Sequence, residues 1–493
     1  MEDQLAARCV EYETTIAAQA ATIARLEARI AEQDARISEL EALVADLQTR
    51  LKQDSSNSSK PPSSNSPYKK PPYPKKPKSG KRSGGQPGHR AHMRAAVPSD
   101  AVDIVEDHYP EQCRRCGNAL SAADDVDQTR GHQVTELPPV KVVVTEHRLH
   151  ACACTACGTI TKAVLPADVP QSAFGPNLQA EVAHLTANCR LSRRGLITYA
   201  AESWGTSISM GSVYRIEQNV SQALAQPYTQ ALETVKAAPV RHVDETHWKQ
   251  SGVLGWLWSM GCVLATVFVI AGTRAGHVFT DTMGDAVENG IFVTDRYRGY
   301  LKKVPMNRRG VCHAHLRRDF AKIEARGGYC GMLGEALRCA HTRMFDVWYR
   351  YRDGEITHDT LGRELGPIKW RMYRLLKNGR SAADKKVAGM CADILRHWPA
   401  MWTFARVPGV EPTNNAAERS LRPAVLWRKG CFGSRSTGGA VFAERMLTVS
   451  QTCRQNGRNV LEYIVTALNA SLLGLPAPQL IPQHSAISQS PAA

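Results

Sequence analysis

The N-terminal part of the chain carries a repeating pattern of apolar positions. Apolar side chains recur every seven residues in one series, and a second series follows with an offset of three. The first series is Cys9, Ile16, Ile23, Ile30, Ile37, Val44 and Leu51, and the second is Leu5, Tyr12, Gln19, Leu26, Gln33, Leu40 and Leu47. β-branched residues in one series with leucine in the other favour a two-stranded parallel coiled coil. We therefore expect residues 1–54 to form a leucine-zipper-like coiled coil that joins two copies of the chain; a single helix packed on its own protein is the alternative.

A long uncharged stretch lies near the middle of the chain. Residues 250–273 contain no charged side chain and are long enough to span a bilayer. Glycines interrupt the stretch, however, and its apolar residues fall into two short groups, 254–258 and 263–270. This pattern predicts two antiparallel strands of one central sheet and no membrane span.

Helical periodicity dominates residues 176–228 and again residues 313–404. In the first region a helix over 196–205, a short turn and a helix over 210–219 resemble a helix-turn-helix, with Ser209 or Ser212 as the N-cap. The side chains that would face a major groove are Ser212, Tyr214, Arg215 and Gln218, and the phosphate contacts would be Arg190, Arg193 and Arg194. A helical hairpin that does not touch DNA is the alternative.

Positive charge is concentrated between the predicted coiled coil and the first helical region. Residues 55–99 contain ten Lys or Arg and no Asp or Glu, and Pro, Ser and Gly fill most of the remainder. Such a composition cannot bury a core and predicts a disordered basic linker, which either contacts DNA or acts as a spacer. The formal net charge of the 493-residue chain is +16, which favours a polyanionic partner.

Two Cys-x-x-Cys pairs follow the linker. Cys113 and Cys116 are separated from Cys154 and Cys157 by 37 residues, and a strand is expected at residues 140–144 between them. Four thiolates in two such pairs are typical of structural Zn²⁺. Cys152 is a further thiol next to the second pair, so the fourth ligand is ambiguous, and disulfides are the alternative. The remaining cysteines show no pattern, which favours a reducing cytoplasm.

Three acidic residues stand in contexts that suggest a metal site. Strand-like runs lead directly into Asp244 and Asp295. Glu418 follows Asn415 by three residues, which is also the spacing of a capping box at the start of a helix. Carboxylate oxygens are the ligands of Mg²⁺ or Mn²⁺, so the three acids together predict a divalent-metal site suited to cutting and joining DNA.

Longer motifs around these acids carry a family resemblance. They are His242-Val243-Asp244-Glu245-Thr246, Gly255-Trp256-Leu257-Trp258, Asp295-Arg296-Tyr297-Arg298-Gly299-Tyr300, Cys312-His313-Ala314-His315-Leu316-Arg317-Arg318-Asp319, Asn414-Asn415-Ala416-Ala417-Glu418-Arg419-Ser420-Leu421-Arg422-Pro423, Trp427-Arg428-Lys429-Gly430 and Glu444-Arg445-Met446-Leu447-Thr448. Over nearly its whole length the chain resembles TnpC-type DDE transposases of the insertion-sequence-sixty-six family. One departure is His313, where the family pattern has tryptophan.

The resemblance implies an α/β multidomain protein with a ribonuclease-H-like catalytic domain, a mixed central sheet with helices, and Asp244, Asp295 and Glu418 as its acidic triad. It also implies a zinc-binding domain with Cys113, Cys116, Cys154 and Cys157 as ligands. The expected organisation is a coiled coil over 1–54, a basic linker over 55–99, the zinc-binding domain over 100–170, a helical DNA-binding region over 171–235, the catalytic domain over 236–455 with a helical insertion at about 313–404, and a C-terminal helix with a loose tail over 456–493.

The expected function is that of an insertion-sequence transposase. It would cleave DNA at the element ends with the help of Mg²⁺ and transfer the freed 3′-hydroxyl to target DNA, with Arg419 and Arg422 as phosphate contacts; Arg422 could instead pair with Glu418. Cys312 and His315 are interpreted as packing residues rather than a partial metal site. The expected partners are DNA, a second copy of the chain and accessory transposition proteins, with no membrane, in a nucleoid-associated, bacterial cytoplasmic setting. A nuclease without strand transfer and a non-catalytic assembly protein are the alternatives.

Overall fold

The computed structural model describes residues 2–51, 95–126, 131–301 and 303–482. It contains two compact units, each described here by itself. The larger comprises Met1–Pro71, Glu146–Tyr199 and Ser207–Ala493, and the smaller Pro72–Thr145 and Ala200–Thr206. The predicted basic linker lies almost wholly outside the described residues.

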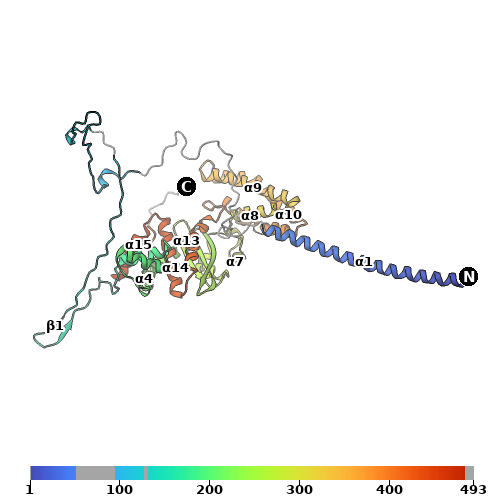
Figure 1. Ribbon diagram of the computed structural model, residues 1–493, viewed down its shortest axis with the longest axis horizontal. Helices are drawn as coiled ribbons and strands as arrows, with labels where there is room; N and C mark the ends of the chain where they lie inside the picture. Colours follow the sequence, from blue (N-terminus) through green and yellow to red (C-terminus); the bar gives the residue numbers. More distant parts are fainter. Residues whose placement is uncertain (1, 52–94, 127–130, 302, 483–493) are drawn as a thin grey trace. The chain divides into compact units, whose positions relative to one another are not determined.

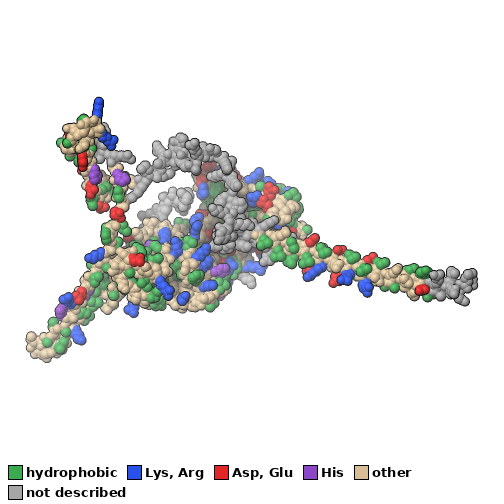
Figure 2. All heavy atoms as spheres, in the orientation of Figure 1, with side chains coloured by type: hydrophobic (Ala, Val, Ile, Leu, Met, Phe, Trp, Pro, Cys, Tyr) green, Lys and Arg blue, Asp and Glu red, His purple; other side chains and the backbone are tan. Residues whose placement is uncertain are grey.

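Helix α1 (Glu2–Leu51) is one continuous helix. Its sequence contains neither Gly nor Pro, the residues that most weaken a helix interior. From Tyr12 onward the apolar residues of its two series are exposed, with Ile16 at 64% and Leu26 at 51%. Figure 2 shows hydrophobic side chains along the length of α1. The predicted helix is therefore confirmed, while its pairing with a second copy stays a prediction.

Five strands form the central sheet, in the order β5-β4-β3-β6-β7. Figure 1 shows strands of this sheet as green and yellow-green arrows beside α13 and α14. The strands are β3 (Val240–Gln250), β4 (Val253–Gly261), β5 (Thr266–Ala271), β6 (Ile291–Thr294) and β7 (Arg309–Val311). β4 is antiparallel to both β3 and β5, whereas β6 runs parallel to both β3 and β7. The sheet is therefore mixed, as predicted, and β3 lies at its centre.

A two-residue turn joins β3 to β4. Gln250 pairs with Val253, which leaves Ser251 and Gly252 in the turn with φ of 51° and 82°. Positive φ at both positions is the type I′ geometry, whose twist matches that of the flanking strands. The two antiparallel strands predicted from the uncharged stretch are confirmed as β4 and β5. Among the residues that the structure describes, no helix is long and apolar enough to cross a membrane.

Further helices precede, interrupt and follow the sheet in the chain. They are α2 (Pro176–Ala187), α3 (Arg193–Trp204), α4 (Met210–Ala223), α5 (Ala225–Ala237), α6 (His277–Met283), α7 (Arg298–Leu301), α13 (Asn415–Cys431), α14 (Thr437–Gln455) and α15 (Val460–Leu472). Short 3-10 helices are η2 (Ser99–Ala101), η3 (Ala122–Asp124), η4 (Gly284–Glu288), η5 (Met306–Arg308) and η6 (Thr403–Ala405). α13 contacts β3 and β4, and α14 contacts β5.

The hydrophobic core beneath α13 shows which side chains of β3 lie on each face of the sheet. Trp248 of β3 packs with Leu421 and Ala424 of α13. Because side chains alternate along a strand, Asp244 lies on the same face as Trp248, and Glu245 lies on the opposite face. The face of the sheet that carries Asp244 is therefore the one that α13 covers.

Five α-helices lie between β7 and α13, where the helical insertion was expected. They are α8 (His313–Glu324), α9 (Gly328–Arg352), α10 (His358–Gly379), α11 (Lys385–Arg396) and α12 (Trp398–Met401). Buried Leu333, Leu337 and Met344 of α9 pack with Leu365 and Leu376 of α10 in a core that also includes Val293 and Val311 of the sheet. The insertion is thus a helical layer built onto the sheet rather than a separate domain.

Two expectations about irregular segments are wrong. Residues 140–144 form no strand, because no other described segment pairs with them; the second Cys pair lies instead between β1 (Ala151–Ala153) and β2 (Ile160–Lys162). The tail after residue 475 is not loose as far as residue 482. Leu480 is buried and its N–H donates to Gln230, 2.9 Å away, so the tail docks on α5.

An aromatic cluster within the insertion contains two buried histidines. His313 is fully buried, and its Nε2 lies 2.8 Å from the carbonyl oxygen of Met401. Its ring stacks on His341 and meets Trp402 and Phe404 edge-on. The imidazole thus occupies an aromatic environment, which explains why it can stand where the resembled family has tryptophan.

These histidines make the stability of the fold sensitive to acid. Burial lowers the pKa of His313 to about 4 and that of His341 to about 3. Both pKa values lie below that of the unfolded chain, about 6.5, so stability is complete above that pH and falls as the pH drops towards the folded values. The unfolding free energy of the parent chain should fall between pH 7.5 and pH 5. We expect this fall to be about 2 kcal/mol smaller in His341→Phe, which lacks the buried imidazole.

Urea unfolding followed by tryptophan fluorescence at the two pH values would measure this difference. His277→Phe, at an exposed position of α6, is the matched control and should leave the acid sensitivity of the parent unchanged. An equal loss in the parent chain and in His341→Phe would contradict the assignment.

Candidate active site

Asp244 and Asp295 reach the same edge of the sheet because β3 and β6 are parallel neighbours. His242 of β3 pairs with Val293 of β6. Two residues further along each strand lead to Asp244 on one and to Asp295 on the other. The register of a single parallel pair therefore brings together two of the three predicted acids.

The loop after β6 fixes the Asp295 carboxylate. The backbone N–H of Tyr297 donates to its Oδ1 over 2.8 Å, which turns the chain sharply after the strand. Its Oδ2 lies 3.9 Å from the guanidinium of Arg274. The backbone carbonyl of Asp295 also faces the buried Arg309, at 3.3 Å. Neighbouring groups thus hold both the side chain and the backbone carbonyl of Asp295.

Glu418 comes from the first turn of α13, and Asn414 anchors that turn to the sheet. The Asn414 side chain is 1% exposed, and its Nδ2 donates to the carbonyl of Val243 over 2.8 Å. Its Oδ1 lies 3.1 Å from Nδ1 of His242, and its backbone N–H donates to the Cys312 sulfur over 3.2 Å. One amide therefore ties the start of α13 to β3, one residue from Asp244.

This arrangement overturns the capping-box alternative. Asn414 rather than Asn415 is the N-cap of α13, and its side chain makes no capping hydrogen bond because it is bound to β3. Glu418 does not reach back to cap the helix either, since its buried Oε1 has no hydrogen-bond partner. Its carboxylate is consequently available for another role.

The three acids share one electrostatic environment. The pKa of Asp244 is raised well above its usual value, first by burial and then by the negative charges of Glu245, Asp295 and Glu418. The negative charges of both other predicted acids therefore act on the Asp244 carboxyl group. A group of oxygen ligands that repel one another in a low-dielectric site is suited to a divalent cation, which would relieve that repulsion.

A second group of residues lies behind the acids and was missed in the sequence. The Glu245 carboxylate is buried, pairs with Arg274 at 2.6 Å and accepts a hydrogen bond from the Tyr300 hydroxyl. Arg274 also stacks over the rings of Tyr297 and Trp256. One feature of the sequence could have pointed to this group: Arg274 is the first charged residue after the uncharged stretch.

The comparison with known families decides the identity of this arrangement. Residues 171–442 match the sequence model of the transposase IS66 family. The chain belongs to this family. Residues 110–158 match the zinc-finger binding domain of transposase IS66, and residues 7–95 match a family of unknown function. The sequence resemblance to IS66 transposases is thereby confirmed.

Two curated relatives come from Sinorhizobium fredii, and both are named uncharacterized proteins. The protein y4qI is 24% identical over 34% of this chain and 32% of its own length. The protein y4hP is 25% identical over 70% of this chain and 68% of its own length. The chain thus spans about a third of the first relative and about two thirds of the second.

The arginines predicted to bind DNA in this IS66 transposase differ in their availability. Arg193 is engaged by Glu217 at 2.6 Å. The other predicted arginines are exposed; they are Arg190, Arg194, Arg215, Arg419 and Arg422. No ion pair joins Arg422 to Glu418 among the residues that the structure describes. The predicted cap of α4 is confirmed, since Ser209 accepts a hydrogen bond from the N–H of Ser212 over 3.0 Å.

The two Cys pairs adopt the same local turn. The N–H of Gly117 donates to the carbonyl of Cys113 over 2.9 Å, and that of Gly158 donates to the carbonyl of Cys154 over 2.8 Å. Both glycines have positive φ, 73° and 72°. Hydrogen bonding with Thr159, first with its side chain and then with its backbone, lowers the pKa of the Cys157 thiol, which favours the thiolate that binds metal.

The anchoring role of Asn414 leads to a test. We expect Asn414→Ala to lower the unfolding free energy by about 1–3 kcal/mol, because the buried carbonyl of Val243 loses its donor. Asn415→Ala, at the adjacent and less buried position, should have little effect. Thermal unfolding of both variants would measure the difference, and equal stability of the two would show that Asn414 does not hold α13 in place.

Proposed function

We propose that this chain is the DNA transposase of an insertion sequence, which cleaves DNA at the element ends and transfers the 3′-hydroxyl to target DNA. The observation that carries the proposal is the electrostatic coupling of Asp244 to Asp295 and Glu418, within the region that matches the family. Family membership implies a ribonuclease-H-like fold. The mixed five-stranded sheet, with one acid on its central strand and one after the neighbouring parallel strand, is consistent with that fold.

The donor set fits Mg²⁺ or Mn²⁺. Asp244, Asp295 and Glu418 offer only carboxylate oxygens, and the Glu418 Oε1 is buried without a partner. These residues would hold the cations, which when bound would stabilise negative charge on the attacking and leaving oxygens. Arg274 neutralises Glu245 on the other face of β3, so that this fourth carboxylate does not compete as a ligand.

The reaction requires two exchanges at phosphorus. Water first attacks a phosphodiester at the element end, the bond to the 3′-oxygen breaks, and that oxygen takes up a proton to leave a free 3′-hydroxyl. This hydroxyl then attacks a target phosphodiester and displaces another 3′-oxygen, so one ester replaces another without a nucleotide triphosphate. The sequence agrees, since it contains no Gly-rich loop ending in Lys-Ser or Lys-Thr. Exposed Arg419 and Arg422 on α13 would contact the phosphates beside the reacting bond.

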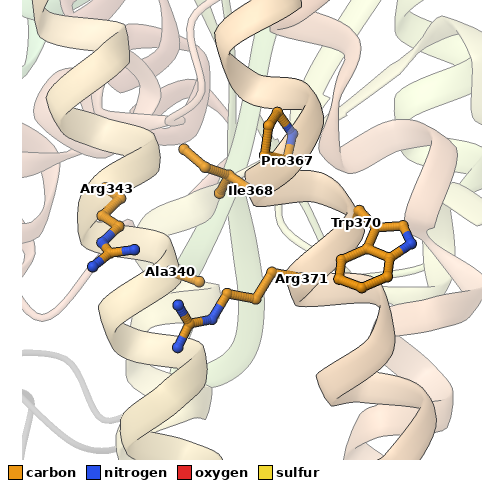
Figure 3. Close-up of a pocket in the computed structure, with 6 residues that line it drawn as sticks. All are labelled: Ala340, Arg343, Pro367, Ile368, Trp370 and Arg371. Carbon is orange, nitrogen blue, oxygen red and sulfur yellow. The ribbon is translucent and has the colours of Figure 1, made fainter.

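The helical insertion also offers a surface suited to DNA. A shallow pocket lies between α9 and α10, lined by Ala340, Arg343, Pro367, Ile368, Trp370 and Arg371. Arg371 extends from α10 towards α9, which carries Arg343, and Trp370 stands at the pocket edge (Figure 3). Trp370 is 62% exposed. Guanidinium groups beside an exposed ring favour contact with phosphates and unpaired bases.

The Cys pairs support a zinc site. The zinc-finger match covers Cys113, Cys116, Cys154 and Cys157, and both pairs have the turn that metal-binding Cys-x-x-Cys segments require. We propose these four thiolates as the ligands of one structural Zn²⁺. Cys152 lies within β1, a strand position rather than a turn, which favours Cys154 as the ligand.

The exposed seam of α1 supports self-association. In a parallel pair of helices in the predicted register, Arg29 of one copy would face Asp34 of the other, and Arg36 would face Glu41. Opposite charges on both sides of an apolar seam favour a second copy of this chain as the partner. Such a dimer would bring two element ends together. Accessory transposition proteins are further expected partners.

Substitution of the acids tests the catalytic proposal. The substrate is a duplex with the terminal repeat of the element and a pre-cut 3′ end, incubated with target plasmid and Mg²⁺. We expect Asp244→Asn, Asp295→Asn and Glu418→Gln each to reduce joining by about a hundredfold or more while end binding persists. Glu411→Gln, at an exposed acid ahead of α13, should retain activity. Cleavage without joining would indicate a nuclease, and binding without either reaction would indicate an assembly protein.

The coiled coil has its own test. We expect Ile23→Asp combined with Ile30→Asp to convert a dimer into a monomer in light-scattering measurements, because buried charges in the seam are costly. Ala21→Asp with Ala28→Asp, on the outer face of the predicted coil, is the matched control and should remain dimeric. A parent chain that is itself monomeric would contradict the proposal.

A further inference from the structure

A second group of metal-ligating side chains lies beside the acids. Cys312 is the N-cap of α8, and His315 lies in its first turn. Potential ligand atoms of Cys312, His315 and Glu418 all lie within 4.8 Å of one another. Helix α8 and helix α13 therefore begin side by side, with one thiol, one imidazole and one carboxylate directed into the same space.

The polar atoms of this group lack other partners. The Nδ1 of His315 and the Oε1 of Glu418 are 3.8 Å apart, and both are buried without a hydrogen-bond partner. Buried polar atoms are rarely left in this state unless a further group satisfies them. The sulfur of fully buried Cys312 faces the same space and accepts the N–H of Asn414.

The chemistry of the three donors distinguishes this site from that of the acids. Sulfur, nitrogen and oxygen donors together favour Zn²⁺ and similar cations, which bind three protein ligands and leave one position open. Mg²⁺ takes oxygen ligands and does not favour thiolate. Burial raises the pKa of the Cys312 thiol to about 11, and the backbone N–H groups of Asn414, His315 and Ala314 act in the opposite direction.

We propose that Cys312, His315 and Glu418 form a binding site for a thiophilic divalent cation such as Zn²⁺, in addition to the proposed Mg²⁺ and zinc-finger sites. Glu418 belongs to both this site and the acidic group. When zinc binds at the new site, Glu418 no longer serves as a ligand together with Asp244 and Asp295. Zinc therefore inhibits the DNA reaction. The inhibitory consequence rests on the proposed function, whereas the binding of zinc does not.

The test measures zinc bound to the full-length protein. The chain is stripped with a chelator, dialysed against buffered micromolar Zn²⁺ and analysed for metal per chain. We expect Cys312→Ser and His315→Ala each to bind one ion less than the parent. Serine retains the acceptor for Asn414, so the fold should persist. Cys391→Ser, at a buried thiol in the core of the insertion, and Asp295→Asn are controls that should bind as much as the parent.

Joining assays provide the second readout. In Mg²⁺, added micromolar Zn²⁺ should reduce joining by the parent at least about tenfold, and Cys312→Ser should resist this inhibition. Equal zinc content in the parent, Cys312→Ser and His315→Ala would overturn the site and return these residues to a packing role. If no variant joins DNA, the zinc content still decides the metal site, so its failure is distinct from that of the transposase proposal.

Discussion

Crowding of negative charge at one edge of the sheet is the interaction on which the site depends. Four carboxylates meet around β3, and their mutual repulsion adds to burial in raising the pKa of Asp244. The fold separates them by face. Glu245 points to the side where Arg274 neutralises it and Tyr300 donates a hydrogen bond to it, while Asp244 shares the other side with α13. A divalent cation bound to these acids would relieve the repulsion that remains and would favour their deprotonated forms.

Such repulsion can be sustained only if the backbone that carries the acids is fixed. Asn414 provides this on the helix side, because its amide satisfies a β3 carbonyl directly beside Asp244. Ser420, further along α13, adds a buried hydrogen bond to Ser259 of β4 at 2.7 Å. The β3–β6 register provides the same on the sheet side. The acids are therefore held together by hydrogen bonds between backbone and neutral side chains, which do not weaken when the carboxylates repel one another.

The sequence predicted those parts of the site that depend on local pattern. Strand-like runs ending in Asp244 and Asp295 became adjacent strands, and the uncharged stretch became β4 and β5, because alternation and turn residues encode both. Local pattern could not predict the role of Asn414. The capping-box spacing that starts at Asn415 concerns contacts within one helix, whereas the Asn414 side chain binds a strand 171 positions away. The pairing of Arg193 with Glu217 and the docking of Leu480 on α5 were missed for the same reason, because each joins segments that sequence spacing does not relate. The prediction of a strand at residues 140–144 was wrong for a different reason. The local sequence suits a strand, but no partner strand exists among the described residues.

The insertion shows how a large helical layer can separate Asp295 from Glu418 in sequence without separating them in space. At its start, the N–H of Cys312 donates to the carbonyl of Thr294, directly before Asp295, over 3.0 Å. The N–H of the next residue, His313, donates to the carbonyl of Pro412 at the far end of the insertion over 2.9 Å. The chain therefore leaves and returns at adjacent points, and the second of these leads directly into Asn414 and α13. Because this closure uses backbone groups beside Cys312, the geometry that brings Glu418 to the aspartates also brings it to Cys312 and His315. The convergence of the acids and the thiol–imidazole pair is thus a single consequence of how the insertion is closed.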